Sequence, residues 1–154
     1  MHIDSEFTVG IHTLLMYGFF TEDRITSNMV ARSVGCNPVI ARKVFSKLSK
    51  AGLLKTGTGN AHTTLAKPTK DITLKDVFLA TEEEGADEAF NMYPENDDCP
   101  ISKDIHKILC PRFQSAMDSM LDDLSKTTIA DLIAELPPEK NRLPEHLRWE
   151  NSKF

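Results

Sequence analysis

The sequence has little cysteine and no long apolar run, and each absence excludes a class of protein. Three cysteines in 154 residues do not make the disulfide framework of a small secreted domain, although they leave room for a free thiol or a metal ligand. No apolar run approaches the roughly 18 residues of a transmembrane helix. The first residues, MHIDSEF, lack the basic and apolar regions of a secretory signal. We therefore expect a cytoplasmic protein.

Motifs for catalysis are also missing. The sequence contains no glycine-rich phosphate loop, no metalloprotease spacing and no nucleophile motif. Its acidic pairs, such as Asp122 and Asp123, fall on what the periodicity predicts to be a solvated helix face. We therefore expect that the protein is not an enzyme.

Charge is distributed unevenly along the chain. Residues 1–70 contain nine Lys and Arg against four Asp and Glu, a net charge of +5, whereas residues 71–154 contain nine against nineteen, a net charge of −10. A cationic first half suits a polyanion such as DNA. The overall net charge of −5 therefore does not argue against DNA binding.

Residues 26–51 are predicted to form two short helices joined by a tight turn. Thr26 stands where a cap of the first helix would be, and Gly35 suits the left-handed conformation that ends it. Asn37 and Pro38 are start signals for the second helix, since Asn caps free amides and Pro suits the first helical position. Gly52 then follows the end of that helix. This order predicts a helix-turn-helix.

The second of these helices has one apolar side and one basic side. On a helical wheel the apolar side contains Ile40, Ala41, Val44, Phe45, Leu48 and Ala51, and the opposite side contains Val39, Arg42, Lys43, Ser46 and Lys50. A recognition helix needs such a side, because cations neutralise phosphates while Arg and Ser reach base edges in the major groove. The alternative is a solvated basic face on an ordinary helix.

A small hairpin is predicted after this helix. Residues 53–56 and 62–65 form short strands in this prediction, and residues 57–60 provide the turn. A helix-turn-helix followed by a hairpin is the order of a winged helix, so we expect a mainly α fold with a small β-hairpin wing. Asn60, His62 and Thr63 are the residues expected to contact phosphate or sugar. The alternative is an ordinary hairpin.

The second half contains the longest periodic stretch of the chain. Apolar residues recur at helical spacing over residues 101–124, and Pro111 is expected to kink or split this helix. Because a domain this small cannot bury so long a stripe, we expect it to pair with the same helix of a second chain. Packing within one chain is the alternative. The expected dimer contacts are Ile105, Ile108, Phe113, Met117, Met120, Leu121 and Leu124.

Four segments follow from these patterns. Residues 1–81 form the winged helix-turn-helix domain, and residues 82–100 form an acidic loop that is a candidate sensor region. Residues 101–136 contain the dimerisation helices. Residues 137–154 are expected to be a polar tail with little to fold around.

The order of these motifs resembles the Rrf-two family of bacterial winged-helix regulators, which includes IscR, NsrR and CymR. The matching pieces are FTVGIHTLL, NPVIARKVFSKLSKAGLLKTGTG, LAKPTKDITLKDVFLA and the run from CPISKDIHKIL to TTIADL. They cover most of residues 5–136, and the NPV and NDDCPI segments are most similar to the YwnA-like subgroup. The resemblance implies a homodimeric transcription regulator, in most cases a repressor, whose helix from Pro38 enters the major groove of palindromic DNA. Beside the hairpin residues, the expected DNA contacts are Thr26, Ser27, Asn37, Pro38, Val39, Arg42, Lys43, Ser46, Lys47 and Lys50.

The rival hypothesis is a winged-helix module that binds another protein and does not bind DNA. A hairpin turn without Arg or Lys and the acidic second half favour this alternative. The basic set Arg42, Lys43, Lys47 and Lys50 favours DNA.

Cys99 and Cys110 leave three interpretations open. They are candidate ligands of an iron–sulfur cluster, with His106 and His12 as further candidates, since cluster-binding members of the resembled family carry cysteines before the long helix. Alternatively, Cys99 is a redox thiol, because a helix start lowers a thiol pKa, although the two aspartates before it oppose this shift. The third interpretation, in which both are structural thiols, is preferred. We therefore expect no cofactor, with the cluster as the alternative.

Overall fold

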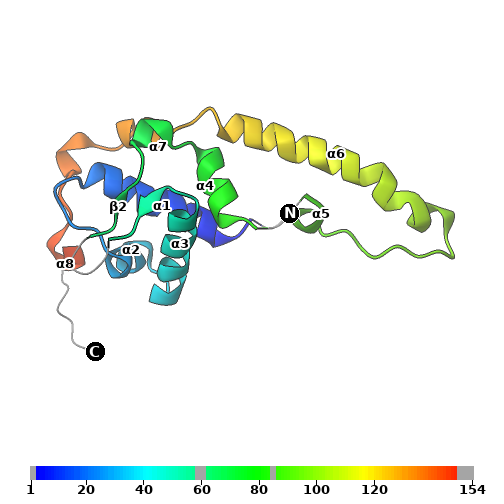
Figure 1. Ribbon diagram of the computed structural model, residues 1–154, viewed down its shortest axis with the longest axis horizontal. Coiled ribbons are helices and arrows are strands. Elements are labelled where there is room, and N and C mark those ends of the chain that lie inside the picture. Colours follow the sequence, from blue (N-terminus) through cyan, green and yellow to red (C-terminus); the bar gives the residue numbers. More distant parts are fainter. Residues whose placement is uncertain (1–2, 58–61, 84–85, 149–154) are drawn as a thin grey trace.

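A winged helix-turn-helix with one long projecting helix is the fold of this chain (Figure 1). The computed structural model describes residues 3–57, 62–83 and 86–148. Its elements are α1 (Ser5–Phe19), α2 (Ser27–Val34), α3 (Pro38–Lys50), β1 (Leu54–Lys55), β2 (Thr64–Leu65), the 3-10 helix η1 (Thr69–Asp71), α4 (Leu74–Thr81), α5 (Ala86–Ala89), α6 (Pro100–Leu124), α7 (Ile129–Ala134), the 3-10 helix η2 (Pro138–Lys140) and α8 (Glu145–Arg148). The predicted class, mainly α with a small hairpin, is confirmed.

The starts of α2 and α3 carry the caps that the sequence predicts. The Thr26 hydroxyl oxygen accepts a hydrogen bond from the Met29 N–H at 3.3 Å, and Gly35 ends α2 with a left-handed φ of +78°. The Asn37 side-chain oxygen accepts a hydrogen bond from the Val39 N–H at 2.9 Å, and Pro38 is the first residue of α3. These caps satisfy amides that have no partner within the helix. They fix where the exposed side of α3 begins.

Helix α1 is the centre of the packed core, with α2, α3, α4 and α7 against it. The completely buried apolar side chains of the core are Leu14, Val30, Ala41, Val44, Leu48, Ile72, Val77 and Ile129. At Gly18 a Cβ atom would lie 2.4 Å from Ile133 Cδ1 and 2.8 Å from Thr69 Cγ2, so α7 and η1 approach α1 this closely only because the residue is glycine. The core thereby holds α3 by its apolar side and leaves the opposite side outward.

The hairpin is shorter than the sequence predicts. Its strands pair antiparallel with Leu54 opposite Leu65 and Lys55 opposite Thr64. Leu54 is buried while Lys55 is exposed, as expected where successive side chains point to opposite faces of a sheet. The tip, residues 58–61, lies outside the described residues, and the predicted contact Asn60 lies there too.

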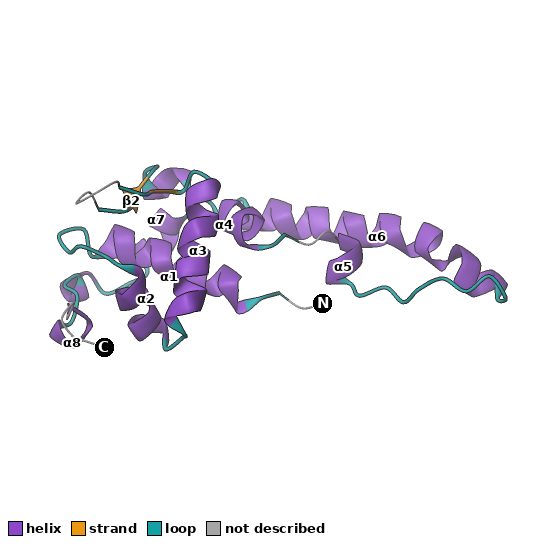
Figure 2. Cartoon of the chain, turned by 60° about the horizontal axis from the view of Figure 1, so that its bottom comes forward, coloured by secondary structure: helices purple, strands orange, loops and turns teal. Residues whose placement is uncertain are grey.

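Helix α6 is one continuous helix of 25 residues, so Pro111 does not split it. It projects from the rest of the molecule in both views, and the segment before it runs back along its length (Figures 1 and 2). Phe90 in that segment stacks on Phe113 with ring centroids 4.3 Å apart. No helix in the described part of the chain is both long and apolar enough to cross a bilayer.

The two halves of α6 have different surroundings. Its C-terminal half packs on α4, where Met117 and Phe78 are buried and Met120, Leu121 and Leu124 are partly buried against them. Of the residues expected to form the dimer, Met117, Met120, Leu121 and Leu124 therefore pack at least partly within their own chain. The N-terminal half keeps Ile101 and Ile108 exposed, at 70% and 49%.

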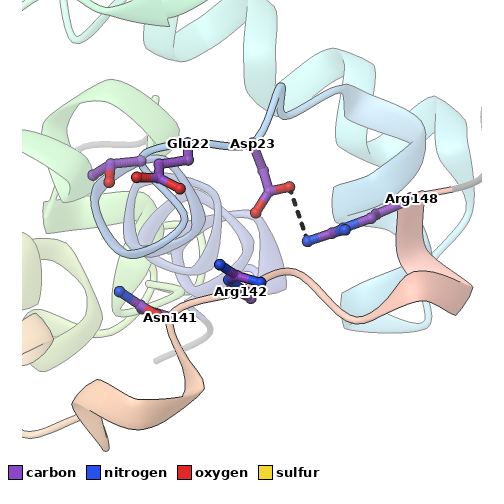
Figure 3. A pocket seen from close by; sticks show the side chains of 6 residues that line it. Glu22, Asp23, Asn141, Arg142 and Arg148 are labelled. Carbon is purple, nitrogen blue, oxygen red and sulfur yellow. Dashed lines mark ion pairs between the residues drawn. The ribbon is translucent and has the colours of Figure 1, made fainter.

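Residues 137–148 pack on the main core and on α2, so for them the expectation of a tail with little to fold around is wrong, whereas residues 149–154 lie outside the described part of the chain. Leu143 is 2% exposed within the main core. Its N–H donates to Asp23 Oδ2 at 3.1 Å, and Arg148 Nη2 lies 3.4 Å from Asp23 Oδ1 (Figure 3). Leu147 is partly buried against the same core, so two leucines and one carboxylate 120 positions before Leu143 hold this otherwise polar segment.

Candidate nucleic-acid interface

The outward side of α3 carries most of the predicted DNA contacts. Val39 is 60% exposed, so its apolar side chain is open to a partner at the start of α3. Arg42, Ser46 and Lys50 are exposed beside it, and so are Asn37 and Pro38 at the start of the helix. Val39, Lys43, Ser46 and Lys50 follow the three-or-four spacing of a single helical stripe. The stripe can present cations to phosphates and polar and apolar atoms to base edges.

The start of α2 lies beside α3 and offers a second polar surface. Thr26 and Ser27 are half-buried there, and the Thr26 oxygen is already engaged as the cap of Met29. The first amides of a helix and the positive end of its dipole favour an anion.

The described part of the hairpin contains His62, which is exposed, and Thr63, which is half-buried. Lys55 is exposed on β1, and Lys67 is exposed just after β2. The sequence prediction assigned these two lysines no contact, although the alternation of buried Leu54 and polar Lys55 was a usable signal. They give the base of the hairpin a positive charge that its turn sequence lacks.

Lys47 has a different environment from the other lysines of α3. Its side chain is only 14% exposed, and its Nζ donates to Glu6 Oε2 at 2.7 Å and to the Thr81 carbonyl oxygen at 2.9 Å. Glu83 Oε1 lies 3.7 Å from the same nitrogen. Lys47 therefore links α1, α3 and the end of α4, and we do not retain it among the candidate DNA contacts.

Glu6 receives a second lysine of α3. Lys43 Nζ lies 2.7 Å from Glu6 Oε1, while the Lys43 side chain stays 58% exposed and that of Glu6 only 7%. Burial would raise the pKa of Glu6, but the hydrogen bonds from Lys43 and Lys47 outweigh it and lower that pKa. The bond to Glu6 raises the pKa of Lys43 in turn. No signal in the sequence pointed to Glu6, since its partners lie about 40 positions away.

The cysteine and histidine candidates are not brought together within one chain. Cys99 caps α6 and Cys110 lies inside it, so about 16 Å of helical rise separates them, too far for two thiolates of one chain to bind one cluster. His106 Nε2 donates to the Tyr93 carbonyl oxygen at 2.6 Å. His12 lies on α1 and pairs with the Ser33 hydroxyl at 2.8 Å. Among the described residues, no group of three His, Cys, Asp or Glu side chains is arranged to hold a metal ion.

Cys99 nevertheless has the electrostatic surroundings of a helix start. The backbone N–H groups of Ser102 and Ile101 lower the pKa of its thiol. This is the direction expected where orphan amides point toward a sulfur. The redox interpretation of Cys99 therefore stays a prediction.

The chain matches a known family over most of its length. A family model named Rrf2 and described as an iron-dependent transcriptional regulator matches residues 3–135. YwnA of Bacillus subtilis (strain 168), by its name an HTH-type transcriptional regulator, is 30% identical over 135 residues, which are 87% of this chain and 98% of YwnA. This match makes the chain a relative of transcriptional regulators and not of enzymes.

Solved structures agree with this match. A transcriptional regulator from Lactobacillus plantarum superposes with a TM-score of 0.72 at 28% identity, over 86% of this chain and 90% of the other. IscR of T. potens superposes with a TM-score of 0.63 over 97% of both chains, and at 16% identity this likeness shows the fold alone. With the family model spanning residues 3–135 and YwnA aligned along nearly its whole length, the chain belongs to the Rrf2 family of transcriptional regulators.

Proposed function

We propose that this protein is a cytoplasmic homodimeric repressor that recognises palindromic promoter DNA. In the proposed complex α3 lies in the major groove, and the residues that face the DNA are Val39, Arg42, Lys43, Ser46 and Lys50. The start of α2 and the base of the hairpin then contact the flanking phosphates. Two α3 helices related by a twofold axis would meet half-sites about one helical turn, roughly 34 Å, apart.

One observation carries the proposal more than any other. In a fold whose core buries the apolar side of α3, the opposite side holds Arg42, Lys43 and Lys50 together with an exposed Val39. Exposing a valine costs a protein its burial energy, whereas a thymine methyl group in the major groove would cover it. The positive first half of the chain supports the same partner, since phosphate contacts supply most of the affinity for DNA.

The test is the binding of purified protein to its own upstream DNA across a salt series, with random DNA as the competitor. We expect a specific complex whose affinity falls steeply with salt, and much weaker binding to random DNA. Arg42→Glu should weaken specific binding by at least about tenfold, because it removes a groove contact and adds repulsion. It should leave the oligomeric state unchanged.

The matched control is Lys103→Glu, the same kind of charge reversal at an exposed position of α6, far from α3. It should leave DNA affinity nearly unchanged. Equal losses in the two variants would show that only overall charge matters, and would contradict the assignment of α3. Equally weak binding to both DNAs would favour a module that binds another protein.

A further inference from the structure

We infer that Glu6 is a positioning residue that competes with DNA phosphate for Lys43 and so sets the affinity of α3 for DNA. The inference rests on the proposed function, because it concerns a lysine of the proposed interface. By this inference a residue of α1 affects how strongly the protein binds DNA. The supporting observation is that the Glu6 carboxylate contacts both Lys43 and Lys47.

Lys43 occupies the middle of the exposed stripe of α3 but its ammonium group does not extend outward. It lies four positions after Val39 and three before Ser46, so its Cβ shares their direction. Yet its Nζ lies 2.7 Å from Glu6 Oε1, on the first turn of α1. The ion pair with Glu6 therefore directs the ammonium group of Lys43 toward α1 and away from the proposed DNA position.

Lys43 and Lys47, the two lysines that contact Glu6, differ in the number of contacts that each would lose on moving away from it. Lys47 is 14% exposed and has three partners, namely Glu6, the Thr81 carbonyl oxygen and Glu83. Lys43 is 58% exposed, and Glu6 is its strongest electrostatic partner. When Lys43 leaves, Lys47 still neutralises the nearly buried Glu6 carboxylate, so no unpaired charge is left inside. The site can thus release one lysine and keep the other.

A DNA backbone offers Lys43 the same chemistry as Glu6. Both provide anionic oxygens that accept from an ammonium group, and the flexible lysine stem allows the exchange without moving the α3 backbone. Every complex would then include the loss of one Lys43–Glu6 pair per protomer. Since ion pairs with an exposed partner are modest, Glu6 should weaken binding about two- to fivefold per protomer.

A double-mutant cycle on DNA affinity tests this competition. Glu6→Gln, Lys43→Gln and the double variant are compared with the wild type on the same promoter DNA. We expect Glu6→Gln to tighten binding two- to fivefold per protomer in the wild-type background and to have no effect in the Lys43→Gln background. Glu83→Gln is the matched control, because it removes one negative charge beside Lys47 and acts on Lys43 only by a weaker electrostatic interaction than Glu6 does. It should change affinity far less than Glu6→Gln does.

A second measurement on the wild type covers the case in which Glu6→Gln does not fold. In NMR spectra of lysine ammonium groups, added promoter DNA should shift the Lys43 signal and leave the Lys47 signal in place. The inference is overturned if both signals stay, or if Glu6→Gln tightens binding equally without Lys43. If wild-type protein binds no DNA, the proposed function and the inference fail together; if it binds and the cycle shows no coupling, only the inference fails.

Discussion

At the scale of single residues, the pKa values of two buried ionisable groups, Glu6 and His12, are shifted by different causes. Glu6 is kept charged although nearly buried, because two lysines approach it to 2.7 Å. His12 is handled differently, because burial lowers the pKa of its ring and so favours the neutral imidazole. The ionisation of Glu6 is therefore coupled directly to two lysines of α3.

The pH dependence of stability should report this carboxylate. The folded pKa of Glu6 lies below its ordinary value of 4.5, so the unfolded chain binds the proton more readily. Glu6 thus stabilises the fold above about pH 4.5, and that contribution is lost as the pH falls through the folded pKa. At pH 7 we expect Glu6→Gln to lower the free energy of unfolding by about 1–3 kcal/mol.

Urea denaturation of both proteins between pH 7 and pH 3 checks this expectation. The difference between wild type and Glu6→Gln should shrink below pH 4.5, because the wild-type carboxyl becomes protonated there as well. A difference that stays constant down to pH 3 would mean that the two lysines do not depend on the charge of Glu6. Comparing the two proteins at each pH cancels the titration of other carboxyl groups, such as Asp4 and Asp131.

At the scale of elements, the C-terminal segment completes the winged helix. Leu143 fills a core position, and both carboxylate oxygens of Asp23 are used by the segment. Asp23 lies in the turn between α1 and α2, so the segment holds this turn through a hydrogen bond and an ion pair (Figure 3). The stability of the helix-turn-helix should therefore depend on residues far from it in sequence.

Replacing Leu143 with alanine measures that dependence. The change removes a side chain that is 98% buried and leaves a cavity, so the free energy of unfolding should fall by about 2–5 kcal/mol. Val39→Ala is the control, since Val39 is 60% exposed and its truncation should change stability by less than about 0.5 kcal/mol. Thermal or urea unfolding of the two variants and the wild type measures these changes in the free energy of unfolding. Similar small losses in both would mean that the segment is not part of the cooperative core.

Local signals explain how much of this fold and site was predictable. Thr26, Asn37 and Gly35 act through amides within a few positions, so the sequence alone located α2, α3 and the exposed stripe. The docking of Leu143 and the inward turn of Lys47 depend on partners 120 and 41 positions away. No local period or motif encodes such contacts, which is why the sequence predicted neither the docking of Leu143 nor the ionic partners of Lys47.

At the scale of the whole molecule, α6 is an arm with one covered half and one open half. Its C-terminal half packs on α4, whereas Ile101 and Ile108 remain exposed on the half that projects outward (Figure 2). Exposed isoleucines on a projecting helix favour a second copy as the partner. We therefore expect the proposed dimer to use the N-terminal half of α6 more than the sequence pattern alone suggested.

A charge on this half should separate the two chains. We expect Ile108→Glu to shift the protein toward monomer in sedimentation experiments, because it places a carboxylate in an apolar contact. Specific DNA affinity should fall with it, since one protomer can occupy only one half-site. Lys107→Glu adds the same carboxylate at the neighbouring exposed position and should leave the oligomer intact. An unchanged dimer in Ile108→Glu would place the interface elsewhere.

The docking of Leu143 also has a consequence for the order in which the protein is made. Ribosomes synthesise α1, α2 and α3 first, and the partner of Asp23 arrives 120 residues later. Until then the core lacks one leucine, and the turn between α1 and α2 has an unpaired carboxylate. The core around α1, α2 and α3 is thus completed only once residue 143 has been translated, so a nascent chain still short of that residue carries an incomplete winged helix.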